Sequence, residues 1–267
     1  MQNKKYKLIA SDLDGTLLDD NSKLSARNKS AILKAVESGV IFVPTTGRPP
    51  KCIDVVTSII DEDIPCITFN GAMACMSKSE KVFFSKYLDL SLAKEIYDIG
   101  LKRDLQMVLW TGSKLWTNKI CKATLDYSNI SSTSLTVTDN LNNLGDKGIL
   151  KMLWIDTPEN VAVFQSEMNE YFGNKLNCHS SLPIFLEFVS PDATKGNAIA
   201  EIGKEYGIDK SKMIVIGDGY NDISMIEYAG LGVSVANAPD EIKAVSDYVT
   251  LSNNEDGVAV VIEKFVL

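Results

Sequence analysis

The chain has 267 residues, of which 45% are hydrophobic and 23% are charged, and its formal net charge is −8. This length suits two domains or one enlarged α/β domain, and the apolar fraction is sufficient for a substantial core. The acidic balance and the absence of a Lys/Arg cluster argue against nucleic-acid binding. No apolar run reaches the roughly 18 residues of a membrane span, so we expect no membrane partner.

The N-terminus and the cysteines both favour a cytoplasmic protein. The chain begins Met-Gln-Asn-Lys-Lys and continues into a predicted strand, so we expect no secretory signal. The five cysteines are odd in number and form no CxxC pair. This pattern favours free thiols in a reducing compartment over disulfides or a zinc site.

The first third of the chain alternates strand-like and helix-like segments. The pattern predicts strands over residues 8–10, 40–43 and 66–69, with helices over 25–38 and after Pro49. Such alternation indicates a doubly wound, Rossmann-like parallel sheet, in which ligands bind outside the carboxyl ends of the strands. Asp12, Thr46 and Asn70 would lie at that edge.

The pattern changes in the middle third, between residues 83 and 189. Here we expect helices over 91–103 and 157–173, a hairpin over 107–118, strands over 149–155 and 184–189, and an exposed connection over 127–143. The mixture of hairpins and helices predicts an inserted α+β domain.

The α/β alternation returns after residue 190. The predicted elements are helices over 194–207, 223–229, 241–245 and 258–265, and strands over 213–216, 231–235 and 248–250. We therefore expect a discontinuous α/β core made of residues 1–82 and 190–267, interrupted by an inserted α+β cap over residues 83–189.

Acidic residues at the predicted strand ends indicate a cation site. Asp12 and Asp14 follow the first strand, and two carboxylates about 4 Å apart repel by roughly 4 kcal/mol at an effective dielectric constant of 20. Asp218 follows a later strand, and hard oxygen ligands without His or Cys favour Mg²⁺ over zinc. Asp222 could hold a metal-bound water or cap the helix that follows.

Donors suited to phosphoryl oxygens belong to the same predicted edge. They are the hydroxyl of Thr46, the backbone N–H of Gly47 and the ammonium of Lys195. Gly217-x-Gly219 lacks the third glycine of a dinucleotide loop and carries Asp218, which would repel a pyrophosphate. We therefore exclude a dinucleotide site.

These motifs resemble those of the haloacid dehalogenase superfamily. The resemblance is carried by Asp12-x-Asp14-Gly15-Thr16, Thr46-Gly47-Arg48, Lys195-Gly196 and Gly217-Asp218-Gly219-x-Asn221-Asp222. The long insert, together with Asn70-Gly71-Ala72, Asn237-Ala238 and Asn253-x-x-Asp256-Gly257-Val258, is similar to the Cof-like phosphatases with a type IIB cap. The resemblance covers nearly the whole chain.

The resemblance implies a role for each matched residue. Asp12 would attack phosphorus and form an aspartyl-phosphate, and Asp14 would act as general acid and then general base. Mg²⁺ would lie between the Asp12 carboxylate, the backbone carbonyl of Asp14, Asp218 and the phosphate. Thr46 and Lys195 would stabilise the developing negative charge, and Asn221 would position these groups. Asp222 would support the metal site, and the substrate-binding residues would be Gly47, Arg48 and Asn70.

We therefore predict a cytoplasmic, Mg²⁺-dependent phosphatase that acts on small phosphorylated metabolites, with sugar phosphates as the first candidates. We expect a monomer or homodimer without nucleic-acid or membrane partners. Two alternatives stay open at this point. A phosphomutase would share the aspartyl-phosphate, and a phosphoacceptor signalling module would share the acidic pocket, the threonine and the lysine.

Overall fold

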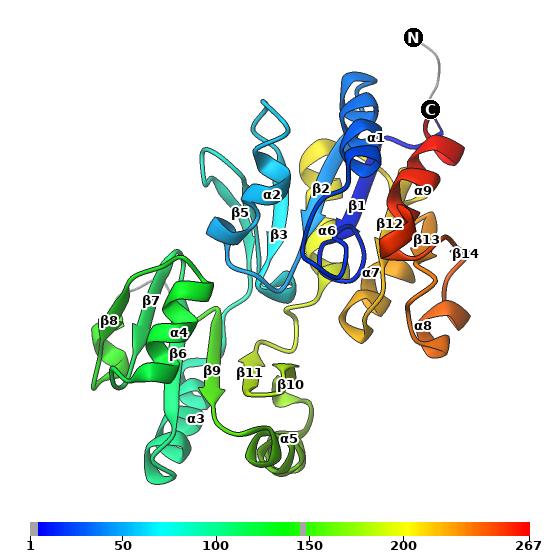
Figure 1. The fold of residues 1–267 in the computed structure, drawn as a ribbon. Helices are drawn as coiled ribbons and strands as arrows, with labels where there is room; N and C mark the ends of the chain where they lie inside the picture. Colours follow the sequence, from blue (N-terminus) through cyan, green and yellow to red (C-terminus); the bar gives the residue numbers. More distant parts are fainter. Residues whose placement is uncertain (1–4, 145–147) are drawn as a thin grey trace. The chain divides into compact units, whose positions relative to one another are not determined.

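The computed structural model describes residues 5–144 and 148–267. The chain divides into two compact units, shown in Figure 1. One unit comprises the chain up to Phe84 together with Thr194–Leu267, and the other comprises Ser85–Ala193. We call them the core unit and the cap unit.

The core unit is built on an eight-stranded sheet. Its spatial order is β14 (Tyr248–Val249), β13 (Leu231–Ser234), β12 (Met213–Gly217), β1 (Leu8–Asp12), β2 (Ile41–Thr45), β3 (Pro65–Thr68), β4 (Met73–Met76) and β5 (Val82–Ser85). The strands from β14 to β3 pair in parallel, whereas β4 runs antiparallel to β3. The predicted doubly wound α/β fold is confirmed, whereas strands β4 and β5 were not predicted.

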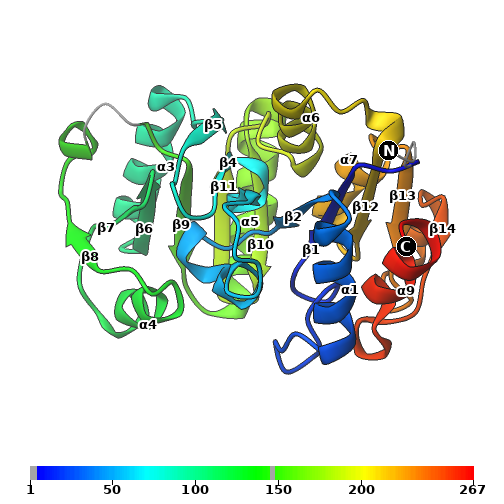
Figure 2. The same ribbon diagram turned by 90° about the horizontal axis from the view of Figure 1, so that it is seen from above.

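Helices cover both faces of this sheet, as Figure 2 shows. On one face α1 (Ala26–Glu37) packs beside α9 (Gly257–Phe265). The other face carries α6 (Lys195–Tyr206), α7 (Ile223–Ile226) and α8 (Asp240–Ala244), whose apolar side chains form a core with β1, β2 and β12. Because both faces are covered, every residue of β1 and β12 is buried, as is usual for parallel strands.

The helix predicted after Pro49 is much shorter than expected. The structure has a 3-10 turn over Pro50–Cys52 and one helical turn, α2 (Asp54–Thr57). No side chain caps the start of α2, and its Val-Val-Thr run consists of β-branched residues that lose χ1 freedom in a helix. Further 3-10 turns lie at Phe69–Gly71, Leu141–Leu144, Gly173–Lys175, Lys210–Lys212, Tyr220–Asp222 and Asn253–Glu255.

The cap unit is a six-stranded sheet with helices. Its strand order is β10 (Asn177–Leu182), β11 (Phe185–Val189), β9 (Lys151–Ile155), β6 (Gln106–Thr111), β7 (Lys114–Thr117) and β8 (Leu135–Val137). All neighbours are antiparallel except β7 and β8. Side chains of α3 (Leu90–Lys102) and α5 (Pro158–Phe172) form the main apolar core with this sheet, around Trp154.

The stretch predicted as an exposed connection over residues 127–143 is mostly exposed, as expected, but it contains regular structure that was not predicted. This stretch contains the end of α4 (Lys122–Ile130), strand β8 and the start of the Leu141–Leu144 turn. Tyr127 is buried and packs edge-on against Phe185. Long-range packing therefore orders a segment whose Ser, Thr and Asn content is typical of a loop.

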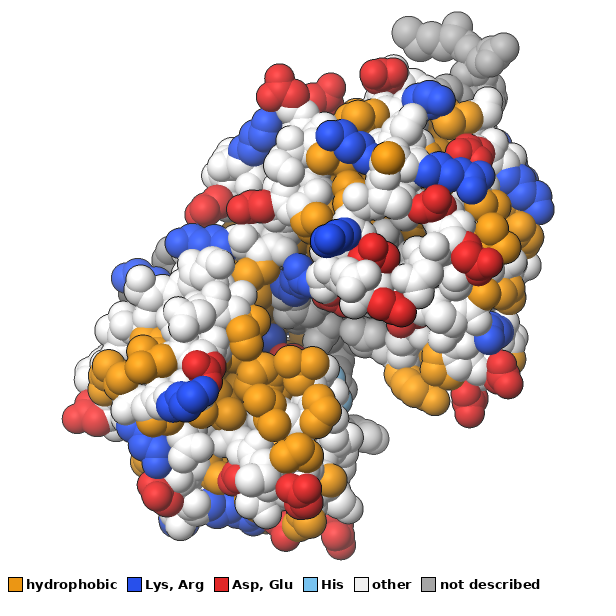
Figure 3. Space-filling view, viewed as in Figure 1, with side chains coloured by type: hydrophobic (Ala, Val, Ile, Leu, Met, Phe, Trp, Pro, Cys, Tyr) orange, Lys and Arg blue, Asp and Glu red, His pale blue; other side chains and the backbone are white. Residues whose placement is uncertain are grey.

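On the face drawn in Figure 3, acidic and basic side chains are interspersed rather than gathered into one basic area. Within residues 5–144 and 148–267, no helix has both the length and the apolar character needed to cross a bilayer.

Candidate active site

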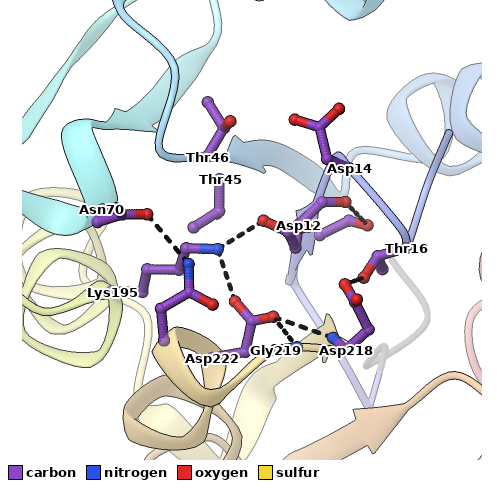
Figure 4. Close-up of polar contacts among 12 residues, drawn as sticks. Asp12, Asp14, Thr16, Thr45, Thr46, Asn70, Lys195, Asp218, Gly219 and Asp222 are labelled. Atoms are coloured by element: carbon purple, nitrogen blue, oxygen red, sulfur yellow. Dashed lines mark hydrogen bonds and ion pairs between the residues drawn. The ribbon is translucent and has the colours of Figure 1, made fainter. Parts of the chain in front are cut away.

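The carboxyl ends of three neighbouring strands bring distant parts of the sequence together in the core unit. Asp12 ends β1 opposite Thr45, the last residue of β2, and Asp218 follows the end of β12 on the other side of β1. Figure 4 shows Asp12, Asp218, Asp222 and Lys195 converging at this edge. The topology thus collects side chains from both ends of the chain.

Lys195 is the buried cation of the site. Its side chain is 0% exposed, and its Nζ donates to Asp12 Oδ1 at 2.5 Å and to Asp222 Oδ1 at 2.6 Å. Burial alone would lower the pKa of Lys195, but the neighbouring carboxylates of Asp12 and Asp222 outweigh it and raise this pKa above its usual value. The lysine is therefore a fixed positive charge.

Two glycines let the N-terminus of α6 deliver Lys195 to this place. A Cβ on Gly71 would lie 2.2 Å from the Thr194 carbonyl carbon, and Gly71 has a φ of +95°. A Cβ on Gly196 would lie 2.4 Å from the Ser224 carbonyl oxygen of α7. The glycines of Asn70-Gly71 and Lys195-Gly196 therefore permit close backbone contacts that a side chain would block.

Asp12 and Asp218 lie in surroundings that disfavour their negative charges. Burial raises the pKa of Asp12 well above its usual value, and the carboxylates of Asp222 and Asp218 raise it further, against the lowering effect of Lys195. Burial and the Asp222 charge also raise the pKa of Asp218, although the Thr16 hydroxyl donates to Asp218 Oδ1 at 2.6 Å. A divalent cation would relieve this repulsion.

Asp222 holds the loop that follows β12. Its Oδ2 accepts the backbone N–H groups of Asp218 and Gly219, both at 2.9 Å, while Oδ1 accepts from Lys195. A Cβ on Gly217 would lie 2.5 Å from the Asp222 carboxyl carbon. Only glycine at position 217 allows this tight turn.

The donor set fits Mg²⁺. Carboxylate oxygens of Asp12, Asp218 and Asp222 all lie within 4.8 Å of one another. Hard oxygen ligands of this kind suit Mg²⁺, which takes one or two carboxylates and keeps water or phosphate in its other positions. Because both Asp222 oxygens already accept hydrogen bonds, Asp12 and Asp218 are the better direct ligands.

The side chain of Asp14 lies apart from this cluster. Arg48 pairs with it through two nitrogens, with Nε donating to Oδ2 at 2.8 Å and Nη2 donating to Oδ1. Figure 4 shows the Asp14 carboxylate pointing away from Lys195 and Asp222. In this structure Arg48 therefore contacts Asp14, a pairing that the sequence motifs did not reveal.

The remaining motif residues pack together on the other side of Lys195. Thr46 Oγ1 accepts the Arg48 N–H at 3.1 Å, and the Thr46 carbonyl accepts the Asn70 N–H at 3.0 Å. Asn221 Nδ2 donates to Asn70 Oδ1 at 3.0 Å. A Cβ on Gly47 would lie 2.8 Å from the same Asn70 oxygen. In this structure the side chain of Asn221 therefore contacts and orients Asn70.

Thr16 is a site residue to which the sequence analysis gave no role of its own. It is fully buried, and its hydroxyl orients the carboxylate of Asp218, which lies 202 residues further along the chain. The signal was present in the motif Asp12-x-Asp14-Gly15-Thr16, but the partner becomes visible only in the fold.

Comparison with known proteins identifies the family. The profile of the haloacid dehalogenase-like hydrolases matches residues 9–262. The chain belongs to this family. It is 33% identical over 268 residues to YxeH of Bacillus subtilis, which is named as a phosphatase, covering 98% of this chain and 99% of YxeH. The resemblance stated from the motifs is confirmed, and the chain is a Cof-like phosphatase of the family.

Two further proteins extend the comparison. The 5-amino-6-(5-phospho-D-ribitylamino)uracil phosphatase YitU of Bacillus subtilis is 28% identical over 265 residues, covering 97% of each chain. The solved structure of the HAD subclass IIB sugar phosphatase BT4131 is 24% identical, with a TM-score of 0.79, covering 97% of this chain and 98% of that one. The latter likeness concerns the fold.

Proposed function

We propose that this phosphatase is Mg²⁺-dependent and hydrolyses small phosphorylated metabolites through a phosphorylated Asp12. The observation that supports the proposal is the meeting of Asp12, Asp218 and Lys195 at the strand ends, where the buried Lys195 ammonium contacts the Asp12 carboxylate and the neighbouring carboxylates could hold a cation. Bound there, Mg²⁺ would neutralise phosphoryl oxygens and act as a Lewis acid.

In the first step Asp12 is the nucleophile. A carboxylate oxygen forms a bond to phosphorus while the bond from phosphorus to the leaving oxygen breaks, and that oxygen takes a proton from Asp14. Lys195 is placed to hold Asp12 in orientation, because it donates to the same carboxylate from a fully buried position. Thr46 and Gly47 directly follow Thr45, which lies opposite Asp12, and they would supply further donors to phosphoryl oxygens.

In the second step water attacks phosphorus and Asp14 accepts its proton, which releases inorganic phosphate and restores Asp12. For either proton transfer, the Asp14 side chain must leave its pairing with Arg48, since its carboxylate points away from the cluster. The released Arg48 would then be available to an anionic substrate.

The proposed substrate class is a phosphorylated sugar or sugar alcohol, and we assign the choice of leaving group to the cap unit. The relative YitU is named for a ribityl phosphate, which supports this class. We further propose a cytoplasmic location and a monomeric or homodimeric state.

Turnover of phenyl phosphate by the purified chain, with Mg²⁺ and with EDTA, tests the metal dependence. We expect many phosphates released per chain with Mg²⁺ and a rate near background with EDTA. An undiminished rate in EDTA would refute the Mg²⁺ assignment. Intact-mass measurement after rapid acid quench should show a phosphorylated fraction, which the Asp12→Asn variant should lack.

A panel of phosphorylated metabolites tests the substrate class. Preference for sugar or sugar-alcohol phosphates over nucleotides and phosphorylated amino acids is the expected result. A hexose phosphate converted to its isomer without release of inorganic phosphate would instead indicate a phosphomutase.

A further inference from the structure

The loop between β1 and α1 carries Asp14 and Thr16, and asparagine side chains hold it from outside. The carbonyl oxygen of Gly15 accepts from Asn237 Nδ2 at 2.8 Å, that of Leu17 from Asn28 Nδ2 at 3.1 Å, and that of Leu18 from Asn253 Nδ2 at 3.1 Å. We call Asn28, Asn237 and Asn253 the asparagine clasp.

The clasp residues are themselves connected through the C-terminal part of the chain. Asn237 Oδ1 accepts the backbone N–H of Asn253 at 3.0 Å, and Asn28 Oδ1 accepts the N–H of Ala259 in α9 at 2.8 Å. Asn253 Nδ2 also donates to Asp20 Oδ1 at 3.1 Å. Asn28 and Asn237 therefore use both the oxygen and the nitrogen of the side-chain amide, whereas Asn253 contacts the loop twice through its nitrogen.

Local sequence fixes the orientation of Asn253. Asp256 has a φ of +62°, and a Cβ on Gly257 would lie 2.1 Å from the Leu251 carbonyl oxygen. Thr250 Oγ1 donates to the Gly257 carbonyl at 2.9 Å. This tight turn points Asn253 inward, where it is only 3% exposed. The proposed chemistry does not use the motif Asn253-x-x-Asp256-Gly257, and the role of this motif is to orient Asn253.

The clasp is connected to the reacting groups through Gly15. Gly15 has a φ of +81°, and a Cβ there would lie 2.6 Å from Asp218 Oδ2. The next residue, Thr16, donates to the other oxygen of Asp218. A shift of the Gly15 peptide would therefore displace both Asp14 and the carboxylate that we assign to Mg²⁺.

We propose that Asn237 and Asn253 are positioning residues that set the geometry of Asp14 and of Asp218 from outside the active site. This inference rests on the proposed function. A loop joined to the fold only by its two ends opens easily, whereas metal and proton-transfer chemistry requires its groups held to within about 0.5 Å. The clasp supplies that restraint through three backbone carbonyls.

The variant Asn237→Asp tests the positioning role of Asn237 most directly. Asp keeps the shape and the oxygen that accepts the Asn253 N–H, but it removes the N–H donor to Gly15. Asn237 is exposed, so the chain should still fold. An added negative charge by itself would tighten Mg²⁺ binding. We expect the opposite, a Mg²⁺ dissociation constant raised and a kcat lowered by about 10-fold or more, as for other groups that orient metal ligands.

Asn253→Ala is the second variant, and Asn118→Asp in the cap unit is the matched control. Asn118 also bridges backbone groups, donating to the Leu105 carbonyl and accepting the Met107 N–H, both at 2.9 Å. Calorimetry with Mg²⁺ alone, phenyl phosphate turnover and thermal unfolding are measured for each protein. The control should change only the unfolding temperature.

The outcomes separate this inference from the proposed function. If the parent binds Mg²⁺ and turns over phenyl phosphate, but Asn237→Asp and Asn253→Ala match its dissociation constant and kcat within twofold, the clasp has only a structural role and the inference fails. If the parent neither binds Mg²⁺ nor shows metal-dependent turnover, the proposed function fails as well. If the parent binds Mg²⁺ without turnover, calorimetry alone decides the role of the clasp.

Discussion

Replacing Asp12 by Asn should abolish turnover without destabilising the fold. The amide has the shape of the carboxylate and can still accept a hydrogen bond from Lys195, but it cannot attack phosphorus. It also removes one of three clustered negative charges from a buried place. We therefore expect this variant to be inactive and at least as stable as the parent in the absence of Mg²⁺.

The distances give the size of the competing terms. At an effective dielectric constant of 20, the Asp12–Lys195 contact of 2.5 Å corresponds to an attraction of about 7 kcal/mol. Asp12 lies within 4.8 Å of both Asp218 and Asp222, and each repulsion amounts to at least roughly 3.5 kcal/mol. Attraction and repulsion nearly cancel, so the desolvation of the Asp12 carboxylate decides the sign and favours the neutral side chain.

The pH dependence follows from the raised pKa of Asp12. Below the unfolded-state pKa of about 3.9, Asp12 is protonated in both states and the substitution has no charge effect. As the pH rises, the folded parent resists ionisation, at a cost of about 1.4 kcal/mol for each unit by which its pKa is raised. The gain in unfolding free energy from Asp12→Asn should therefore be absent at pH 3.5 and present at pH 7.5.

Urea unfolding at both pH values, without Mg²⁺, is the assay, and Asp63→Asn is a control of opposite sign. Burial alone would raise the pKa of Asp63, but hydrogen bonds from Ser79 and Lys78 lower it, so Asp63→Asn should lose more stability at pH 7.5 than at pH 3.5. A loss of more than about 2 kcal/mol for Asp12→Asn at pH 7.5 would refute the charge balance derived above. Substantial residual turnover would place the nucleophile elsewhere.

Two other variants test the general acid and the cap. Asp14→Asn should slow hydrolysis of the phosphorylated intermediate, so intact-mass analysis should find phosphorylated protein accumulating; a variant running at the parent rate would exclude Asp14 as acid and base. In the cap, Glu187→Gln should cost about 3–5 kcal/mol because it leaves Lys151 buried without its carboxylate, whereas the double change Lys151→Met with Glu187→Leu should be neutral or stabilising, as urea unfolding would measure. Burial would raise the pKa of Glu187 and Lys151 lowers it, so the unfolding free energy of the parent should fall as the pH drops from about 5 through this lowered pKa. The double variant lacks the titrating group, and equal acid sensitivity in that variant would contradict this assignment.

Local signals in the sequence located most helices of the core. Ser25 and Thr194 cap α1 and α6 through their side chains, as the pattern indicated. In the cap, Thr157 likewise caps α5, with Pro158 in its first turn. Such signals work because a cap satisfies backbone groups within three residues of itself. They need no knowledge of the rest of the fold.

Strand β10 and helix α4 show where local signals fail. The β10 sequence, Asn-Cys-His-Ser-Ser-Leu, is polar, and its strand forms because it pairs with β11. In α4, Tyr127 is buried against Phe185 of β11 and its hydroxyl accepts from Trp110 of β6. Strand β10 depends on its neighbour β11, and helix α4 depends on contacts with β6 and β11. Propensity alone therefore does not predict either element.

The sequence by itself determined the α/β class, the family and which residue types gather at the strand ends, because strand periodicity and short motifs are local properties of the chain. Only the tertiary structure decided that Arg48 pairs with Asp14, that Thr16 orients Asp218, and that Asn237 and Asn253 hold the loop between β1 and α1. The physical reason is that a hydrogen bond depends on distance and direction, and for residues 34 to 235 positions apart these are set by the packing of the whole core unit.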